Sequence, residues 1–290
     1  MGRGNVVKSI HHPHPEPAIL SIRTNLASLQ IAGSMKRNQR GLAQSLERVS
    51  SGRRINRAAD DAAGLATATN LETRIESTRM AMRSANDGIS IIQTAEGEVG
   101  TAIDNIQRMR ELAIQAASGT ITNTERGYIA DEYDKLTDSL KLSSKNSQFN
   151  GIQLVDGSVP TLSVQVGAGN GTNNRIDIDM ASIRDAYNTL LRSGVSTETD
   201  ARAALKSIDI AVQQLNSDRS KLGAAHNRLL SSVSFSESYT AALSSSMSAI
   251  IDTDYASESS HLAKQQVMQS AAAAALAQAK NLNRSIISLI

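Results

Sequence analysis

The chain has no cysteine and no tryptophan among its 290 residues, and aromatic residues make up only 2% of it. The absence of cysteine excludes disulfides, thiol catalysis and zinc–thiolate sites, and it suits a protein that must survive oxidising surroundings. A compact globule of this size normally fills its centre with aromatic rings, whereas a thin helical bundle packs with Leu, Ile, Val and Ala. The composition therefore favours an elongated helical architecture.

Proline, charge of one sign and long apolar runs are also scarce. Of the 4 prolines, only Pro160 lies beyond the first 17 residues, so most of the chain is free of the residue that breaks helices. The net charge is +2 with both signs interspersed, which gives no support for nucleic-acid binding. No apolar run reaches about 18 residues, so we expect no membrane insertion. A secretory signal of the basic, apolar, small-residue type is also missing, so export would use another route.

Residues 1–20 differ in composition from the rest of the chain. Proline, glycine and histidine cluster there and no helical period is visible, which predicts a disordered leader. His11, His12 and His14 could bind a transition metal. Clustered imidazoles without rigid supports are usually weak, adventitious ligands, so we expect no metal site and no cofactor.

Helical hydrophobic periodicity runs through most of the remaining chain. A first helix is predicted from residue 21 to Gly52, which fits a position just after a helix end. A long seam of alternating 3 and 4 spacing follows from Ile75 to Ala113, and a shorter helix is predicted over 124–144. Heptad spacing returns from Ile208 to Ile250, after the helix-start cluster STETD at 196–200. The last helix, about 255–288, is rich in alanine.

Residues 150–180 change character. Leu162, Val164 and Val166 alternate with polar residues, the turn-forming sequence GAGNGTNN follows, and Ile176 and Ile178 alternate again. This pattern predicts a β-hairpin. The glycines do not form a phosphate loop, because no Lys-Ser/Thr pair follows and no helix opens after them.

Together these patterns predict a mainly α fold, an elongated antiparallel helical bundle or coiled coil with a small β-hairpin insert. We expect a terminal coiled-coil domain from 21–58 and 252–290, and an inner helical domain over 59–251. Both chain ends are predicted to be helices with apolar faces, but neither end encloses a core alone. This pattern is typical of a chain that packs against copies of itself. The predicted packing and self-assembly residues are Ile22, Leu26, Leu29, Leu42, Leu46, Val49, Leu222, Leu229, Leu276, Ile286 and Leu289.

No constellation of residues indicates catalysis. Asp60 and Asp61 are adjacent carboxylates, which are better explained as candidate helix caps because neighbouring residues on a helix point about 100° apart. His226 lies on a helix seam, and His261 is exposed by pattern. There is no nucleophile–base motif, metalloprotease motif or phosphate-binding loop. We therefore expect that the chain is not an enzyme.

An ordered series of motifs resembles bacterial flagellin, the filament subunit of the flagellum. The motifs are SIRTN at 21–25, LERVSSGRRIN at 46–56, DDAAGLA at 60–66, ANDGIS at 85–90, QTAEG at 93–97, QRMRELA at 107–113, QFNG at 148–151, LGA at 222–224, NR at 227–228 and DTDYA at 252–256. Together they cover about 21–290. Residues 1–20 extend beyond the family's usual start.

The resemblance implies a hairpin-shaped subunit whose paired termini line the filament channel, in a compact form without large outer domains. It implies export of the unfolded chain through the flagellar type III route and a location outside the cell, in the filament. The implied partners are other copies of the chain, an export chaperone, and cap and junction proteins. In flagellins that activate Toll-like receptor 5, the stretch at 107–112 forms much of the contact, which makes candidates of Gln107, Arg108, Arg110, Glu111 and Leu112.

Two other kinds of protein share some of these sequence features. A hook–filament junction protein shares the same terminal sequences and is the alternative within the same class. A chemoreceptor-like signalling bundle is also rich in Ala and Ser with heptads, but it would need membrane spans or a linked sensor, and neither is present.

Overall fold

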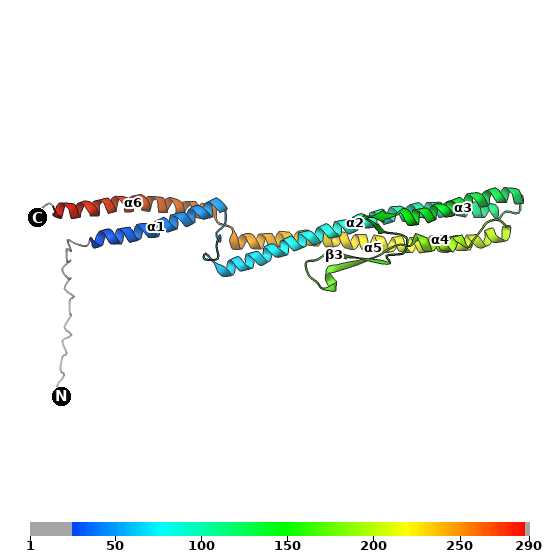
Figure 1. Ribbon diagram of the computed structural model, residues 1–290, viewed down its shortest axis with the longest axis horizontal. Helices are drawn as coiled ribbons and strands as arrows, with labels where there is room; N and C mark the ends of the chain where they lie inside the picture. Colours follow the sequence, from blue (N-terminus) through cyan, green and yellow to red (C-terminus); the bar gives the residue numbers. More distant parts are fainter. Residues whose placement is uncertain (1–24, 288–290) are drawn as a thin grey trace, which may run out of the picture. The chain divides into compact units, whose positions relative to one another are not determined.

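The computed structural model describes residues 25–287, which divide into two compact units (Figure 1). Among these residues, the terminal unit comprises 25–65 and 251–287, and it contains α1 (Leu26–Ser51) and α6 (Tyr255–Ile287). The inner unit comprises residues 66–250 and holds the rest of the secondary structure. The prediction of a mainly α chain with a small β-hairpin is confirmed.

Helices α2 (Ala62–Ala116) and α5 (Glu198–Ile251) are the long elements of the inner unit. They run antiparallel, because early residues of α2 face late residues of α5. Arg110 forms an ion pair with Asp209 at 3.1 Å, and Glu96 lies beside Gly223. Arg110 falls on the 3–4 spacing of the predicted seam, but it is exposed and does not lie in the core.

The core of the inner unit follows the predicted seams. Ile75, Ile92, Val99 and Ile106 of α2 are buried, as are residues of α5 at heptad spacing. Aliphatic side chains and alanines fill this core almost alone, and Tyr133 is its one fully buried ring among the described residues. A thin bundle needs few rings because no part of its interior is far from the surface.

Local hydrogen bonds set the helix ends, several of them where the sequence predicts. The C-cap Gly52 of α1 has φ of 68°, a left-handed conformation that glycine adopts without steric cost. Asp61 caps α2 by accepting from the backbone N–H of Gly64 at 2.9 Å. Asp254 accepts from the N–H groups of Ala256 and Ser257 at the start of α6.

The predicted hairpin consists of β3 (Thr161–Gln165) and β4 (Arg175–Asp179), which pair antiparallel with Val164 opposite Ile176. A short 3-10 turn, η1 (Thr172–Asn174), precedes β4. The hairpin packs on α2 at Gly88, where an added Cβ would lie 3.0 Å from a methyl group of Val164. The glycine therefore allows the strand to approach the helix closely, and any larger side chain would crowd it.

Three further elements complete the inner unit. Helix α3 (Asn123–Asn146) matches the predicted segment and begins with a capping box, in which Thr122 and Glu125 bond each other's backbone N–H. The two-stranded sheet of β1 (Gln148–Phe149) and β2 (Ile152–Gln153) and the helix α4 (Ile183–Leu191) were not predicted. The signal for α4 was present, because its Ser182 N-cap precedes buried residues at helical spacing, Ile183, Ala186 and Leu190.

Candidate functional site in the paired terminal helices

Polar side chains form hydrogen bonds and an ion pair between the α1 segment and α6. Asn25 donates from Nδ2 to the carbonyl oxygen of Ala279 at 3.0 Å, across 254 positions of sequence. Asn38 donates from Nδ2 to the carbonyl of Gln265 at 2.9 Å. Near the other end of the pair, Arg48 lies 3.7 Å from Glu258. Polar groups at a helix interface specify register at some cost in stability, so these contacts define how the two helices align.

Small residues bring the two helices close together. Gly41 of α1 lies against the side chain of Gln265, and an added Cβ would come within 2.6 Å of its amide nitrogen. Ser45 is the buried residue of α1. On the opposite helix the alanine-rich stretch from Ala271 to Ala275 presents little side chain, and the shallow groove there is shared with Gln30 and Ile31. The pair is therefore narrow and does not enclose an apolar core.

The large apolar residues of the pair are exposed. On α1, Leu26 is 67% exposed and Leu29 is 60% exposed. On α6, Val267 is 69% exposed, and Tyr255 and Met268 are exposed too. Burying a leucine or valine side chain is worth about 1.5–3 kcal/mol, so the isolated pair forgoes a considerable stabilisation. Scattered apolar residues are normal on a surface, but on a helix pair without a core of its own they provide a surface for a partner.

The loop after α1 is held by backbone bonds within the terminal unit. The N–H of Arg54 donates to the carbonyl of Ile251 at 2.6 Å, and Ile55 is buried. Asp60 does not cap α2, and its carboxylate instead accepts from the backbone N–H groups of Arg57 and Asn56. These backbone bonds lower the pKa of Asp60 below its usual value, because they stabilise the charged form of the carboxylate.

The predicted packing residues fall into three groups in the structure. Leu26, Leu29 and Leu46 are exposed on α1, whereas Leu42, Val49 and Leu276 are half-buried. Leu222 and Leu229 belong to the inner unit and are fully buried there. Ile22, Leu289 and the side chain of Ile286 lie outside the described residues.

The candidate receptor-contact residues lie on α2 of the inner unit, and the structure corrects one of them. Gln107, Arg108, Arg110 and Glu111 are exposed, but Leu112 is 2% exposed and packs in the core. A residue four positions from an exposed one lies about 40° around the helix, which is enough to turn Leu112 onto the buried face. Leu112 therefore cannot be a surface contact in this conformation.

Arg108 is the centre of an exposed charged cluster. Its guanidinium contacts Glu132 of α3 at 2.9 Å and Glu111 of its own helix at 2.9 Å. Hydrogen bonds to these two carboxylates raise the pKa of Arg108 above its usual value. The cluster therefore presents a charged group on the surface, and it joins Glu132 of α3 to α2.

The described part of the chain has neither a cluster of metal ligands nor a helix fit to cross a membrane. No three His, Asp or Glu residues within 25–287 lie close enough together to hold a metal ion. Over the same residues, none of the helices combines the length and the apolarity that crossing a membrane requires. His226 is half-buried on α5, and His261 is exposed on α6. The described chain does have an exposed apolar surface, because the pair of α1 and α6 leaves its large apolar residues uncovered.

Comparison with known proteins shows where such a chain belongs. The model of the bacterial flagellin N-terminal helical region matches residues 22–159, and that of the C-terminal helical region matches residues 205–290. A flagellin of Halalkalibacterium halodurans is 32% identical over 93% of this chain and 99% of its own length. The chain belongs to the flagellin family.

Two further flagellar proteins are similar to this flagellin. The flagellar filament core protein flaB2 of Brachyspira hyodysenteriae is 34% identical, over 93% of this chain and 99% of its own. A solved structure from Vibrio parahaemolyticus, described as a flagellar hook-associated protein, has a TM-score of 0.56. It covers 66% of this chain and 99% of that protein, at 14% identity, so it shows a shared fold.

Proposed function

We propose that this flagellin is a structural subunit that polymerises into the bacterial flagellar filament used for motility, outside the cell. The observation that carries the proposal is the terminal helix pair, which aligns through polar contacts and leaves Leu26, Leu29 and Val267 exposed. Lateral packing of many copies would bury these residues and supply the apolar stabilisation that the isolated pair lacks. The filament role of relatives such as the Brachyspira core protein supports the same conclusion.

Export of the unfolded chain by the flagellar type III route, with an export chaperone and with cap and junction proteins as partners, is part of this proposal. A narrow helical chain without cysteine can pass through a channel unfolded and refold without disulfide exchange. Unfolding would expose few aromatic or β-rich segments that promote aggregation.

Seeded assembly tests the proposal. Purified flagellin added to short filament fragments should elongate them into long filaments visible by electron microscopy, because each added copy buries apolar faces of the last. A junction protein would bind filament or hook ends without forming long filaments. Failure to elongate over a range of protein and salt concentrations would contradict the filament role and favour the junction alternative.

We further propose that the Arg108 cluster is a contact for Toll-like receptor 5 on the free subunit. Arginine beside exposed side chains is a common hot spot, and Arg108 is held in place by two carboxylates. Arg108→Ala should weaken signalling by the free subunit in a receptor reporter assay about tenfold or more. Arg79→Ala is the matched control, because Arg79 is also an exposed, ion-paired arginine of α2. Equal signalling by both variants would exclude Arg108 as the contact.

A further inference from the structure

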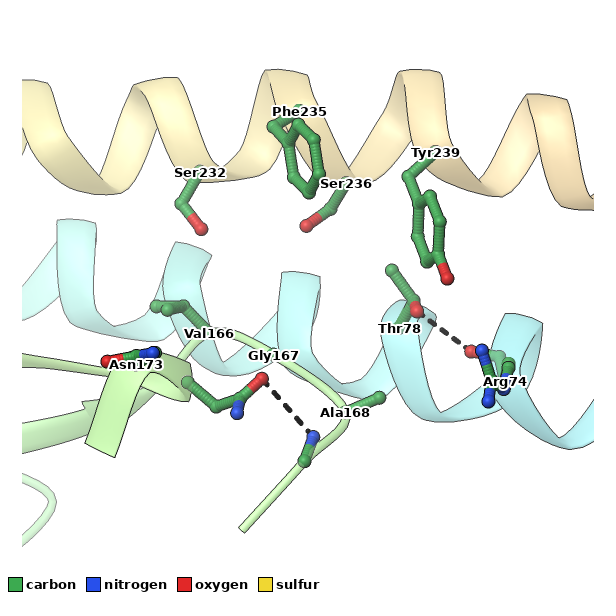
Figure 2. Close-up of a pocket in the computed structure, with 12 residues that line it drawn as sticks. Arg74, Thr78, Val166, Gly167, Ala168, Asn173, Ser232, Phe235, Ser236 and Tyr239 are labelled. Carbon is green, nitrogen blue, oxygen red and sulfur yellow. Dashed lines mark hydrogen bonds between the residues drawn. The ribbon is translucent and has the colours of Figure 1, made fainter. Parts of the chain in front are cut away.

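A pocket of about 450 Å³ opens between the hairpin turn, α2 and α5 in the inner unit (Figure 2). Val166–Gly169, Asn173 and Asn174 of the turn form one wall. The turn is internally bonded: Gln165 donates from Nε2 to the carbonyls of Gly167 and Gly169, at 2.8 and 2.6 Å. The wall is therefore already ordered before anything binds.

The opposite wall carries two stacked aromatic rings. Phe235 and Tyr239 of α5 lie with ring centroids 5.9 Å apart and planes within 7° of parallel. Phe235 is 69% exposed, in a chain with only 2 phenylalanines and 5 tyrosines. A stacked pair made of an exposed ring and a half-buried ring, beside a concavity, has the make-up of a binding hot spot.

Two polar groups in the pocket lack a partner. Ser236 is 4% exposed, its side chain faces the pocket, and its hydroxyl forms no hydrogen bond within residues 25–287. Arg74 of α2 lies at the same end of the pocket as Tyr239 and forms no ion pair among the described side chains. A guanidinium without an ion pair beside aromatic rings is complementary to a second molecule that brings a carboxylate.

The complementary groups lie on α3 of the same unit. Tyr128 is 71% exposed, and Asp131 is exposed and forms no ion pair within the described chain. Residues three apart on a helix share one face, so a ring and a carboxylate stand together about 5–6 Å apart. A ring and a carboxylate side by side are chemically complementary to a pocket lined by two rings and Arg74.

The two surfaces of one copy cannot meet. Arg74 and Arg108 are 34 positions apart on α2, which is about 50 Å along a helix. The ion pair between Arg108 and Glu132 places Glu132, the neighbour of Asp131, at the Arg108 level. The pocket and Tyr128–Asp131 are therefore separated by most of the length of α2, and only a second copy can bring them together.

We infer that the pocket receives Tyr128 and Asp131 of a second copy of this chain, with Tyr128 against the Phe235–Tyr239 rings and Asp131 paired with Arg74. The contact joins two different surfaces, so it is head-to-tail, and repeated head-to-tail contacts produce an open filament unless they close into a ring. The inference rests on the proposed filament function and adds to it a defined longitudinal contact between inner units.

Charge reversal tests the contact in seeded assembly of the full chain. Arg74→Glu and Asp131→Arg should each raise the critical concentration for elongation about tenfold or more, because each puts like charges together. The double variant R74E with D131R should recover most of the loss. Asp138→Arg is the matched control, since Asp138 is an exposed residue of the same α3 stripe, and it should not rescue R74E.

Cross-linking supplies a second readout that does not depend on the charges. The chain has no cysteine, so Phe235→Cys in one preparation and Tyr128→Cys in another give single reactive sites. A short bis-maleimide added to mixed filaments should join the two proteins as a dimer. Phe235→Cys mixed with Leu142→Cys, an exposed position farther along α3, should give no dimer.

The outcomes separate this contact from the proposed function. Three results would overturn the contact and leave the filament function standing. The R74E variant could elongate like the wild-type chain, or D138R could rescue R74E where D131R does not. The cross-link from position 235 could also form with position 142 and not with position 128. A wild-type chain that fails to elongate would contradict the filament function and the contact together. Arg74 and Asp131 are exposed, so melting curves of their variants should match wild type and exclude misfolding as the cause.

Discussion

Leu222→Asp is expected to abolish cooperative folding of the inner unit. Leu222 is fully buried between α2 and α5, in the same core as Leu215 and Leu229. An unpaired carboxylate at such a position costs several kcal/mol, and proteins are stable by only about 5–15 kcal/mol in total. Thermal melting followed by circular dichroism should show loss of the main transition or a large fall in its midpoint.

Leu230→Asp provides the matched control for this substitution. Leu230 is on the same helix, is 48% exposed and accepts a charge into solvent. Its melting curve should stay close to that of the wild-type chain. Identical melting of the two variants would place Leu222 on the surface and contradict the antiparallel packing described above.

Filament formation should be lost, with folding of the inner unit kept, when Leu26 and Leu29 are both changed to Asp. These side chains are exposed in the single subunit, so the substitutions remove little of its own packing. Each leucine buried between copies would contribute about 1.5–3 kcal/mol, so the critical concentration should rise by about a hundredfold or more. Seeded elongation, measured by sedimentation of polymer, gives this number.

A control for added charge uses the same helix. Gln39→Asp with Ala43→Asp adds two carboxylates at exposed polar or small positions of α1. It should raise the critical concentration much less than the leucine pair, because no large apolar side chain is removed. If both double variants elongate like wild type, the exposed leucines are not an assembly surface and the proposed role of the terminal pair is wrong.

The sequence predicted the elements of the fold well where the signal is local. Gly52 ends α1 with a left-handed backbone, and Asp61 caps α2 by accepting from an N–H group three residues away. The hairpin was predicted because inward and outward residues alternate on a strand, and the pairing of β3 with β4 has that alternation. The short elements α4 and β1–β2 were missed because their patterns are only a few residues long.

The candidate sites were less predictable, because periodicity shows which face of a helix is apolar and not what covers it. Leu222 and Leu26 both fit heptad patterns, yet one is fully buried and the other is 67% exposed. Leu112 was a receptor-contact candidate because of the resemblance, and it lies in the core. Which apolar residues remain exposed depends on the partner helix, which lies far away in sequence.

By itself the sequence determined the family, through an ordered series of motifs, and it determined several helix ends and the heptad seams, because these depend on residues within a turn or two of one another. Only the tertiary structure decided that α1 and α6 align through Asn25 and Asn38, that their leucines face outward, and that Phe235, Tyr239 and Arg74 border one pocket. These arrangements join positions up to 254 residues apart. Such contacts depend on how packed helices are aligned, and no local pattern of residue types records that alignment.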